Sequence, residues 1–162
     1  MTLQLEHIQG YLAHGLKVIS GNGKSLIRDV VFEHQKNLTT ITVNNLVSGI
    51  GHKPILRKLD LTKIITVNGV EIIPLLELAE IHDPNSEWNL NDMYPFVYSM
   101  SYEFQFIEGN FYMNDNSDES RGINNQLQLF KWLYANKFDV EGLVDAGLAI
   151  DAHTLETNPY NS

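Results

Sequence analysis

The alternation of hydrophobic and polar positions predicts several β-hairpins, and one of them is especially clear. Asn68-Gly69 separates two segments rich in β-branched residues, Lys63–Val67 and Val70–Ile73. An Asn-Gly pair readily adopts the positive φ angles of a two-residue hairpin turn. The register that such a turn imposes should place Ile65 opposite Ile72.

Two further hairpins follow from the same kind of pattern. Leu16–Ser20 and Ser25–Glu33 flank the turn-forming sequence Gly21–Lys24, in which glycine and asparagine tolerate positive φ. Near the other end of the chain, Gly109-Asn110 precedes the short hydrophobic segment Phe111–Met113. We therefore expect a first hairpin around residue 22 and a third around residue 109.

The segment Tyr94–Phe106 has an aromatic residue or methionine at every even position. This period of two is typical of a strand. Thirteen extended residues would span about 40 Å, much longer than an ordinary strand, so we expect a bend near Ser99–Ser101. We also expect the even-numbered stripe to be mostly buried: Tyr94, Phe96, Tyr98, Met100, Tyr102, Phe104 and Phe106.

Helical spacing of apolar residues predicts a short N-terminal helix over about Leu3–Ala13, closed by Gly15. Pro74 suits the first turn of a helix that ends near His82. A longer helix follows from an apolar stripe whose members recur at helical spacing and are expected to be covered: Ile123, Leu127, Phe130 and Tyr134, widened by Leu129, Trp132 and Leu133.

Asp139 could cap a further short helix, Val140–Ala146, with Gly147 in the left-handed position after it. An additional strand is expected at Leu38–Val43 and a last extended piece at Leu148–Ile150.

These elements predict an α+β fold with about six or seven strands, mostly in antiparallel hairpins. The amphipathic helix near the C-terminus should pack on the strands. With 162 residues, of which 43% are hydrophobic, the chain suits one domain over residues 1–156. We expect residues 157–162 to be a frayed tail. There is no cysteine, so disulfides and thiolate metal sites are excluded.

Charge is distributed unevenly along the chain. All eleven charged side chains between Ile64 and Ser120 are acidic, and the formal net charge of the whole chain is −9. Such a balance opposes direct binding to a nucleic-acid backbone and favours a basic surface on a partner protein. The N-terminus lacks a basic leader before an apolar run, so we expect a cytoplasmic protein without membrane insertion.

Two apparent ligand motifs are incomplete. Gly23-Lys24-Ser25 resembles the end of a phosphate-binding loop, but Val18 occupies the place of the first glycine. In the acidic segment Asp115–Glu119, Ser120 and Gln126 stand where a calcium loop needs glycine and glutamate. We therefore expect neither a metal nor another cofactor.

No nucleophile motif is present, and we expect a protein that is not an enzyme. Two places could still support a small enzyme or ligand-binding module. The Gly49–Lys58 loop contains several cationic groups that could hold an anion. In the second, Asp151 could orient His153. Side chains resting on the surface are the favoured explanation of both patterns.

Interface residues are the more favoured candidates. Trp88 lies in a polar segment and is a large side chain of the kind that dominates interfaces. The expected acidic face comprises Glu103, Glu108, Asp115, Asp118 and Glu119. This face should be contiguous unless the basic N-terminal third folds across it.

Residues 5–18, 53–63, 67–75 and 124–151 together resemble small uncharacterised proteins of phages and prophages of Bacteroidetes-type bacteria. The resemblance is strongest from Leu127 to Asp151 and implies no particular activity. It leads us to expect a non-enzymatic accessory protein that binds a host macromolecule in the cytoplasm. One form would be an acidic DNA mimic or anti-defence inhibitor. A minor virion or assembly component is an alternative, as is the small enzyme or ligand-binding module described above.

Overall fold

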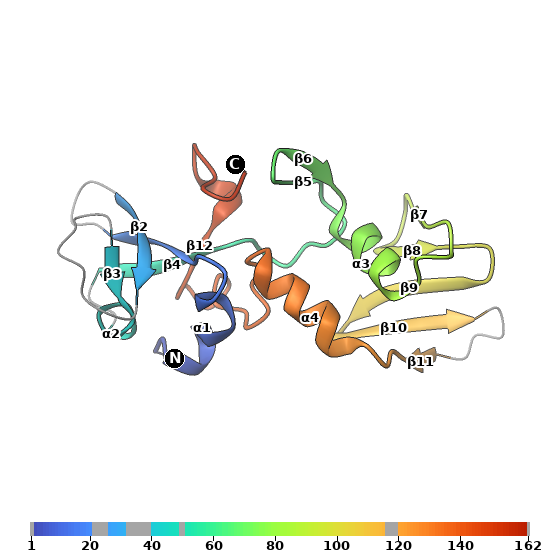
Figure 1. The fold of residues 1–162 in the computed structure, drawn as a ribbon, viewed down its shortest axis with the longest axis horizontal. Coiled ribbons are helices and arrows are strands. Elements are labelled where there is room, and N and C mark those ends of the chain that lie inside the picture. The colour runs from blue at the N-terminus through green and yellow to red at the C-terminus, as the bar shows by residue number, and fades with distance from the viewer. Residues whose placement is uncertain (1, 21–25, 32–39, 49–50, 116–119, 162) are drawn as a thin grey trace. The chain divides into compact units, whose positions relative to one another are not determined.

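The computed structural model of the protein (Figure 1) describes residues 2–20, 26–31, 40–48, 51–115 and 120–161. Contacts divide the chain into two compact units. The first contains residues 1–59 and 133–160, and the second contains residues 60–132 and 161–162. The described residues form four α-helices and three sheets whose strands are mostly antiparallel. The expected α+β class is thus confirmed, whereas a single domain over 1–156 stays a prediction.

The first unit is built around a five-stranded sheet with strand order β12-β4-β1-β2-β3. β1 pairs antiparallel with β2 and β4, while β3 runs parallel to β2 and β12 parallel to β4. The β1–β2 pairing confirms the first hairpin, although its turn, residues 21–25, lies outside the described residues. The bounds are Lys17–Ser20 for β1, Leu26–Val31 for β2, Thr40–Thr42 for β3, His52–Leu56 for β4 and Ile150–Asp151 for β12.

Helices α1 and α2 belong to this unit (Figure 1). α1, Leu5–Leu12, confirms the N-terminal helix, and Gly15 follows it at a φ of 71°. α2, Val43–Val47, was not predicted: the Thr42 hydroxyl accepts the Asn45 amide and starts a helix directly after β3. The apolar core includes Leu3, Ile8, Tyr11, Leu16, Val18, Val43, Leu46, Leu56, Leu143 and Ala149.

Tyr11 links α1 to the C-terminal part of the first unit. Its hydroxyl donates to the Phe138 carbonyl at 2.9 Å and accepts the Val140 amide at 3.1 Å. Its ring meets the Tyr134 ring edge-on at 4.9 Å. Tyr11 therefore has two roles: its buried ring adds apolar area to the core, and its hydroxyl satisfies two backbone groups.

Tyr160 lies in the segment 157–162 that we expected to be frayed, yet it is held by several hydrogen bonds. Its hydroxyl accepts the Lys17 amide at 3.0 Å and donates to the Ile55 carbonyl at 2.8 Å. The side chain thus bridges β1 and β4 next to Pro54, which has no amide hydrogen to offer the ladder. The Arg57 guanidinium donates to the Tyr160 carbonyl at 2.8 Å and approaches its ring.

The expected helix Val140–Ala146 is wrong. The segment is a series of turns, and Gly142 adopts a φ of 69°, which an α-helix cannot accommodate. Asp139 does act as an acceptor, but for the amides of Leu143 at 2.8 Å and Val144 at 2.7 Å. It therefore organises a turn instead of capping a helix.

The second unit begins with the predicted Asn68-Gly69 hairpin. β5, Ile65–Val67, pairs antiparallel with β6, Val70–Ile72, and Ile65 lies opposite Ile72 as expected. The helix α3, Pro74–His82, starts at the predicted proline. The amide of its second residue, Leu75, donates to the Leu61 carbonyl at 2.9 Å.

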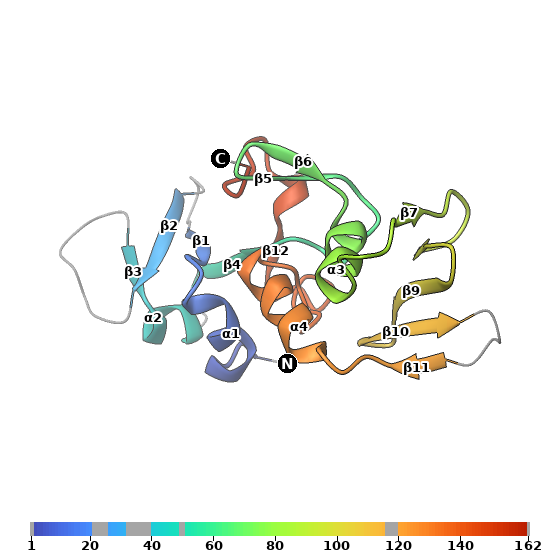
Figure 2. The same cartoon turned by 45° about the vertical axis from the view of Figure 1, so that its right-hand side comes forward.

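A second five-stranded sheet, with order β11-β10-β9-β8-β7, forms most of this unit (Figure 2). The third hairpin is confirmed between β9 and β10, with its turn at Glu108 and Gly109 at φ angles of 49° and 80°. α3 packs on β7 and β8. The bounds are Asn89–Leu90 for β7, Phe96–Tyr98 for β8, Tyr102–Ile107 for β9, Asn110–Asp115 for β10 and Ser120–Gly122 for β11.

The long strand expected at Tyr94–Phe106 is a hairpin. The chain reverses after Ser99, whose amide donates to the Tyr102 carbonyl at 2.8 Å. The reversal places Val97 opposite Phe104, so even positions of β8 lie on the other face of the sheet from even positions of β9. The expectation of a buried stripe is therefore wrong for most of it: Phe104 is fully buried, whereas Tyr94, Tyr98 and Met100 are exposed.

Phe104 is the centre of an aromatic cluster on the covered face of this sheet. It stacks on His82 and Phe111, and Trp88 meets it edge-on at 6.1 Å. Phe130 of α4, Gln126–Ala135, adds an edge-on contact to Phe111. The boundary between the two units falls within α4.

The predicted C-terminal helix is present, but the side that it exposes differs from the expected stripe. Leu127 is 70% exposed, whereas Leu129 and Leu133 are buried. The side-chain amide of Gln126 holds the start of α4 to β10, because it accepts from the Phe111 amide and donates to the Phe111 carbonyl.

Candidate functional site

The charge imbalance follows the division into units. Residues 60–132 contain three Lys and Arg against twelve Asp and Glu, which gives the second unit a formal net charge of −9. Residues 1–59 and 133–160 contain eight of each, so the first unit is formally neutral. The whole net charge of the chain therefore resides in the second unit.

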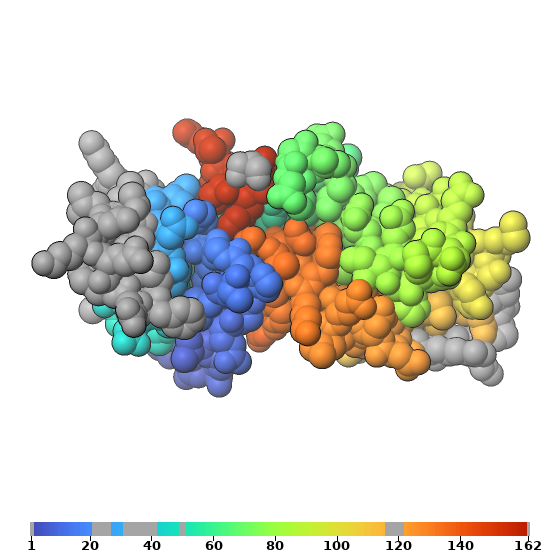
Figure 3. Space-filling view, viewed as in Figure 1, coloured from blue at the N-terminus to red at the C-terminus, as the bar shows by residue number. Residues whose placement is uncertain are grey.

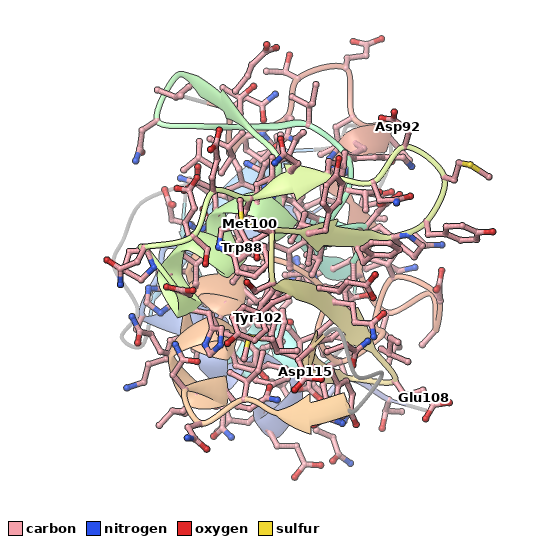
Figure 4. All side chains as sticks on the ribbon, turned by 90° about the vertical axis from the view of Figure 1, so that its right-hand side faces the viewer. Trp88, Asp92, Met100, Tyr102, Glu108 and Asp115 are labelled. Atoms are coloured by element: carbon pink, nitrogen blue, oxygen red, sulfur yellow. The ribbon has the colours of Figure 1, made fainter. Side chains whose placement is uncertain are left out.

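The expected acidic residues of the β9–β10 hairpin do not form one cluster. Glu103 is exposed on one face of the sheet, whereas Asp115 pairs with Tyr102 on the other face. Glu108 lies in the turn, about 17 Å from Glu103 along the strand. Figure 4 shows Glu108 and Asp115 at separate places. Asp118 and Glu119 lie outside the described residues.

Trp88 is not the exposed anchor that its polar sequence neighbours suggested. The side chain is 7% exposed, and its indole nitrogen donates to the Asp83 carbonyl at 3.1 Å. Its ring packs against Phe104. The expected exposure of Trp88 is therefore wrong, and its interface role stays a prediction.

Three described lysines of the N-terminal third have local partners. Lys53 donates to the Gly147 carbonyl at 2.6 Å, and Lys63 pairs with Asp60 at 3.0 Å. Lys58 pairs with Asp145 at 2.7 Å, a bond that raises the pKa of the ammonium group. Among the described residues, Glu103 and Glu108 take part in none of the ion pairs.

The Gly49–Lys58 loop does not gather its cationic groups into an anion site. Residues 49–50 lie outside the described residues, and His52–Leu56 form β4. Successive side chains of a strand point to opposite faces, which separates His52 from Lys53. Burial, followed by the Arg28 guanidinium, lowers the pKa of His52. Arg57 is 2% exposed and engages Tyr160.

Asp151 and His153 do approach each other, with 3.2 Å between His153 Nδ1 and Asp151 Oδ1. The same carboxylate oxygen accepts the His153 amide at 3.0 Å and lies 3.4 Å from the Lys58 amide. It thereby caps the 3-10 helix η1, Ala152–Thr154. A capping role accounts for this pair, and His153 is exposed.

A recess in the second unit was not foreseen from the sequence. It has a volume of about 400 Å³, is open to solvent, and lies between Thr62 and residues 90–95 in the β7–β8 loop. Met93 is 80% exposed and Tyr94 is 60% exposed at its rim. The available signal was the turn-forming Asn91-Asp92 pair followed by Met-Tyr-Pro. Figure 3 shows this yellow-green segment at the surface.

The described part of the chain has neither a cluster of metal ligands nor a helix that could span a membrane. In that part, no group of three His, Asp or Glu side chains is placed to hold a metal ion. None of the helices described there is long and apolar enough to cross a bilayer.

Comparison of the chain with protein-family models, with curated proteins and with solved structures gave no match. The resemblance to phage and prophage proteins stays a prediction.

Proposed function

We propose that the chain is a non-enzymatic accessory protein of phage or prophage type whose acidic second unit binds a basic surface of a host protein in the cytoplasm. The observation that carries this proposal is the confinement of the net charge of −9 to one unit. Several carboxylates of that unit are exposed: Glu71, Glu80, Glu87, Asp92, Glu103 and Glu108. Among the ion pairs of the described residues of this unit, none involves these six carboxylates.

Dispersed surface carboxylates act mainly through long-range attraction. Each contributes little by itself, because exposed ion pairs are worth at most about 1 kcal/mol. Together they create a field that attracts a basic partner and raises the association rate. Such binding should weaken as salt rises, since the screening length is about 8 Å at physiological ionic strength.

The spacing of the carboxylates favours a basic protein surface over a site built to hold duplex DNA. Phosphates recur at about 3.4 Å of axial rise along each DNA strand. Glu103 lies in β9 and Glu108 in the turn that follows it, about 17 Å further along the chain. A row of carboxylates at phosphate spacing is therefore not present along this strand, and the DNA-mimic form is the less supported version of the proposal.

Affinity capture tests the proposal. Tagged protein is incubated with lysate of infected host cells, and the affinity of the recovered protein is then measured at about 50 mM and about 300 mM salt. A double variant, Glu103→Gln with Glu108→Gln, should bind several-fold more weakly. Its matched control, Glu6→Gln with Glu156→Gln, removes two exposed charges from the first unit and should bind normally.

Equal affinity of all variants at both salt concentrations would contradict the proposal. Recovery of the protein in purified virions instead of with a host protein would favour an assembly role.

A further inference from the structure

We infer that the recess beside the β7–β8 loop is a docking site for a lysine or arginine side chain of the partner protein. This inference rests on the proposed function, because it names the place where a basic partner would make its specific contact. It differs from that proposal in requiring one site instead of a general field.

The recess is lined by apolar and polar groups together, and one of the polar groups is a carboxylate. Leu90, Met93, Tyr94 and Pro95 provide the apolar groups, and Asp92 lies among them. A lysine or arginine side chain has the same two parts, since its methylene stem prefers apolar surface and its charged end prefers a carboxylate.

The loop that forms the recess is held in place before any partner binds. The side-chain oxygen of Asn91 accepts the amides of Met93 and Tyr94, both at 2.9 Å. The Asn91 amide donates to the Phe96 carbonyl at 3.0 Å, and the Phe96 amide donates to the Tyr94 carbonyl at 2.8 Å. A preorganised loop loses little conformational entropy on binding, which leaves more of the contact energy for affinity.

Two large side chains of this loop remain exposed despite that order. Met93 is 80% exposed, and Tyr94 is 60% exposed while stacking on Phe96 at 6.4 Å. A tyrosine ring held by a neighbouring ring offers a cation a flat surface at little entropic cost. Methionine adapts its shape to different partners. Both residue types suit a contact with the stem and head of a cationic side chain.

The negative charge in and around the recess favours a cationic side chain as its occupant. Asp92 is exposed and makes no ion pair with the described residues (Figure 4). Thr62 belongs to the wall of the recess, and Lys63 is the next residue along the chain. The ammonium group of Lys63 pairs with Asp60 at 3.0 Å. The surrounding unit has a net charge of −9. An anionic side chain would be repelled, and an uncharged one would leave the carboxylate unused.

The test is a titration of the full-length, ¹⁵N-labelled protein followed by NMR. The ligand is acetyl-Gly-Arg-Gly-amide, and its control is the same peptide with citrulline, which has nearly the shape of arginine without the charge. We expect amide shifts concentrated at Thr62, residues 90–94 and Phe96, with binding of the citrulline peptide at least about threefold weaker.

Three variants locate the contact. Asp92→Asn and Tyr94→Ala should each weaken binding of the arginine peptide by about two- to fivefold. Glu108→Gln removes one charge of the general acidic field from another exposed loop of the same unit, and it should weaken binding of the arginine peptide clearly less than Asp92→Asn does. All three side chains are exposed, so spectra of the free variants should retain the wild-type pattern outside the substituted loop.

Two outcomes would overturn the inference. Shifts scattered over the unit, with Asp92→Asn and Glu108→Gln equally weakened, would mean that only the general field attracts cations; the proposed function would then stand without this site. Equal binding of the arginine and citrulline peptides would mean that the recess does not select charge. Failure of the proposed function is seen separately, as salt-independent binding of the captured partner.

Discussion

Replacing Phe104 with alanine should destabilise the second unit by about 3–5 kcal/mol. The side chain has no exposed surface, and its ring contacts His82, Trp88 and Phe111 at centroid distances of 5.8, 6.1 and 5.6 Å. Truncation removes a large transfer energy and leaves a cavity that three rings can only partly fill. At a urea m-value of about 2 kcal/mol/M, the expected loss moves the midpoint by about 1.5–2.5 M.

Tryptophan fluorescence is a suitable assay, because both tryptophans of the chain belong to the second unit. Tyr98→Ala is the matched control: it removes an aromatic ring from β8 that is 43% exposed, and it should cost less than about 1 kcal/mol. A loss below about 1 kcal/mol for Phe104→Ala, or equal losses for the two variants, would refute the packing described for this sheet.

Three other substitutions test contacts of the first unit. Gly10→Ala should destabilise by about 1 kcal/mol, because a Cβ at this position would lie 2.7 Å from the Tyr134 ring and crowding outweighs the gain in helix propensity. Tyr160→Phe should cost about 1–3 kcal/mol in urea unfolding, since it leaves two backbone groups without their hydroxyl partner. NMR should show His52 titrating below pH 6.5, and Arg28→Gln should raise that pKa.

The lowered pKa of His52 determines how this residue changes the stability of the fold with pH. Burial and the nearby cation disfavour protonation in the folded state, so between the folded pKa and 6.5 the unfolded chain binds more protons. Stability from this group is complete above pH 6.5 and declines as the pH falls through the folded pKa. A stability that rises on acidification through this window, with the other titrating groups accounted for, would contradict the assignment.

Controls for the other two variants come from the same chain. Gly122→Ala places a Cβ where no atom lies within 4 Å, and it should change stability little. A similar loss for Gly10→Ala and Gly122→Ala would point to backbone effects in place of the Tyr134 contact. Tyr98→Phe removes a hydroxyl from an exposed ring and is the comparison for Tyr160→Phe.

Local chemistry was sufficient to predict those elements whose ends are determined by particular residues. Asn68-Gly69 specifies a turn type, and the turn type determines the register, so Ile65 and Ile72 could be paired from the sequence. Pro74 marks the start of α3 for a similar reason, because its ring suits the first helical turn.

The periodic pattern of apolar residues gave wrong predictions where it could not determine the direction of the chain or the buried side of a helix. An alternating pattern continues unchanged through a tight reversal of the chain, so Tyr94–Phe106 read as one strand although Ser99 begins a turn. The apolar residues of α4 cover most of its circumference, which left its buried side undetermined and Leu127 wrongly placed. Tertiary contacts decide both questions, and a periodic pattern does not contain them.

The candidate site was predictable only in its charge. A count of carboxylates along the chain located the acidic segment, but faces of a sheet depend on strand pairing, which separates Glu103 from Asp115. Trp88 was misjudged because its sequence neighbours are polar while its spatial neighbour is Phe104. Tyr94 is the opposite case, because it shares the even-numbered aromatic pattern of Phe104 in the sequence but is exposed in the structure.

The exposure of Tyr94 and Met93 contrasts with the burial of other large side chains in the second unit. The same sheet buries Phe104 and Phe111 completely, so its aromatic residues are covered where the fold can cover them. The β7–β8 loop is instead fixed by bonds from Asn91 that hold its neighbours outward. Order with so little burial costs conformational entropy and recovers only part of the hydrophobic energy of these side chains within the chain. A partner that covers these side chains would supply the missing contribution, and Asp92 specifies that the partner be cationic.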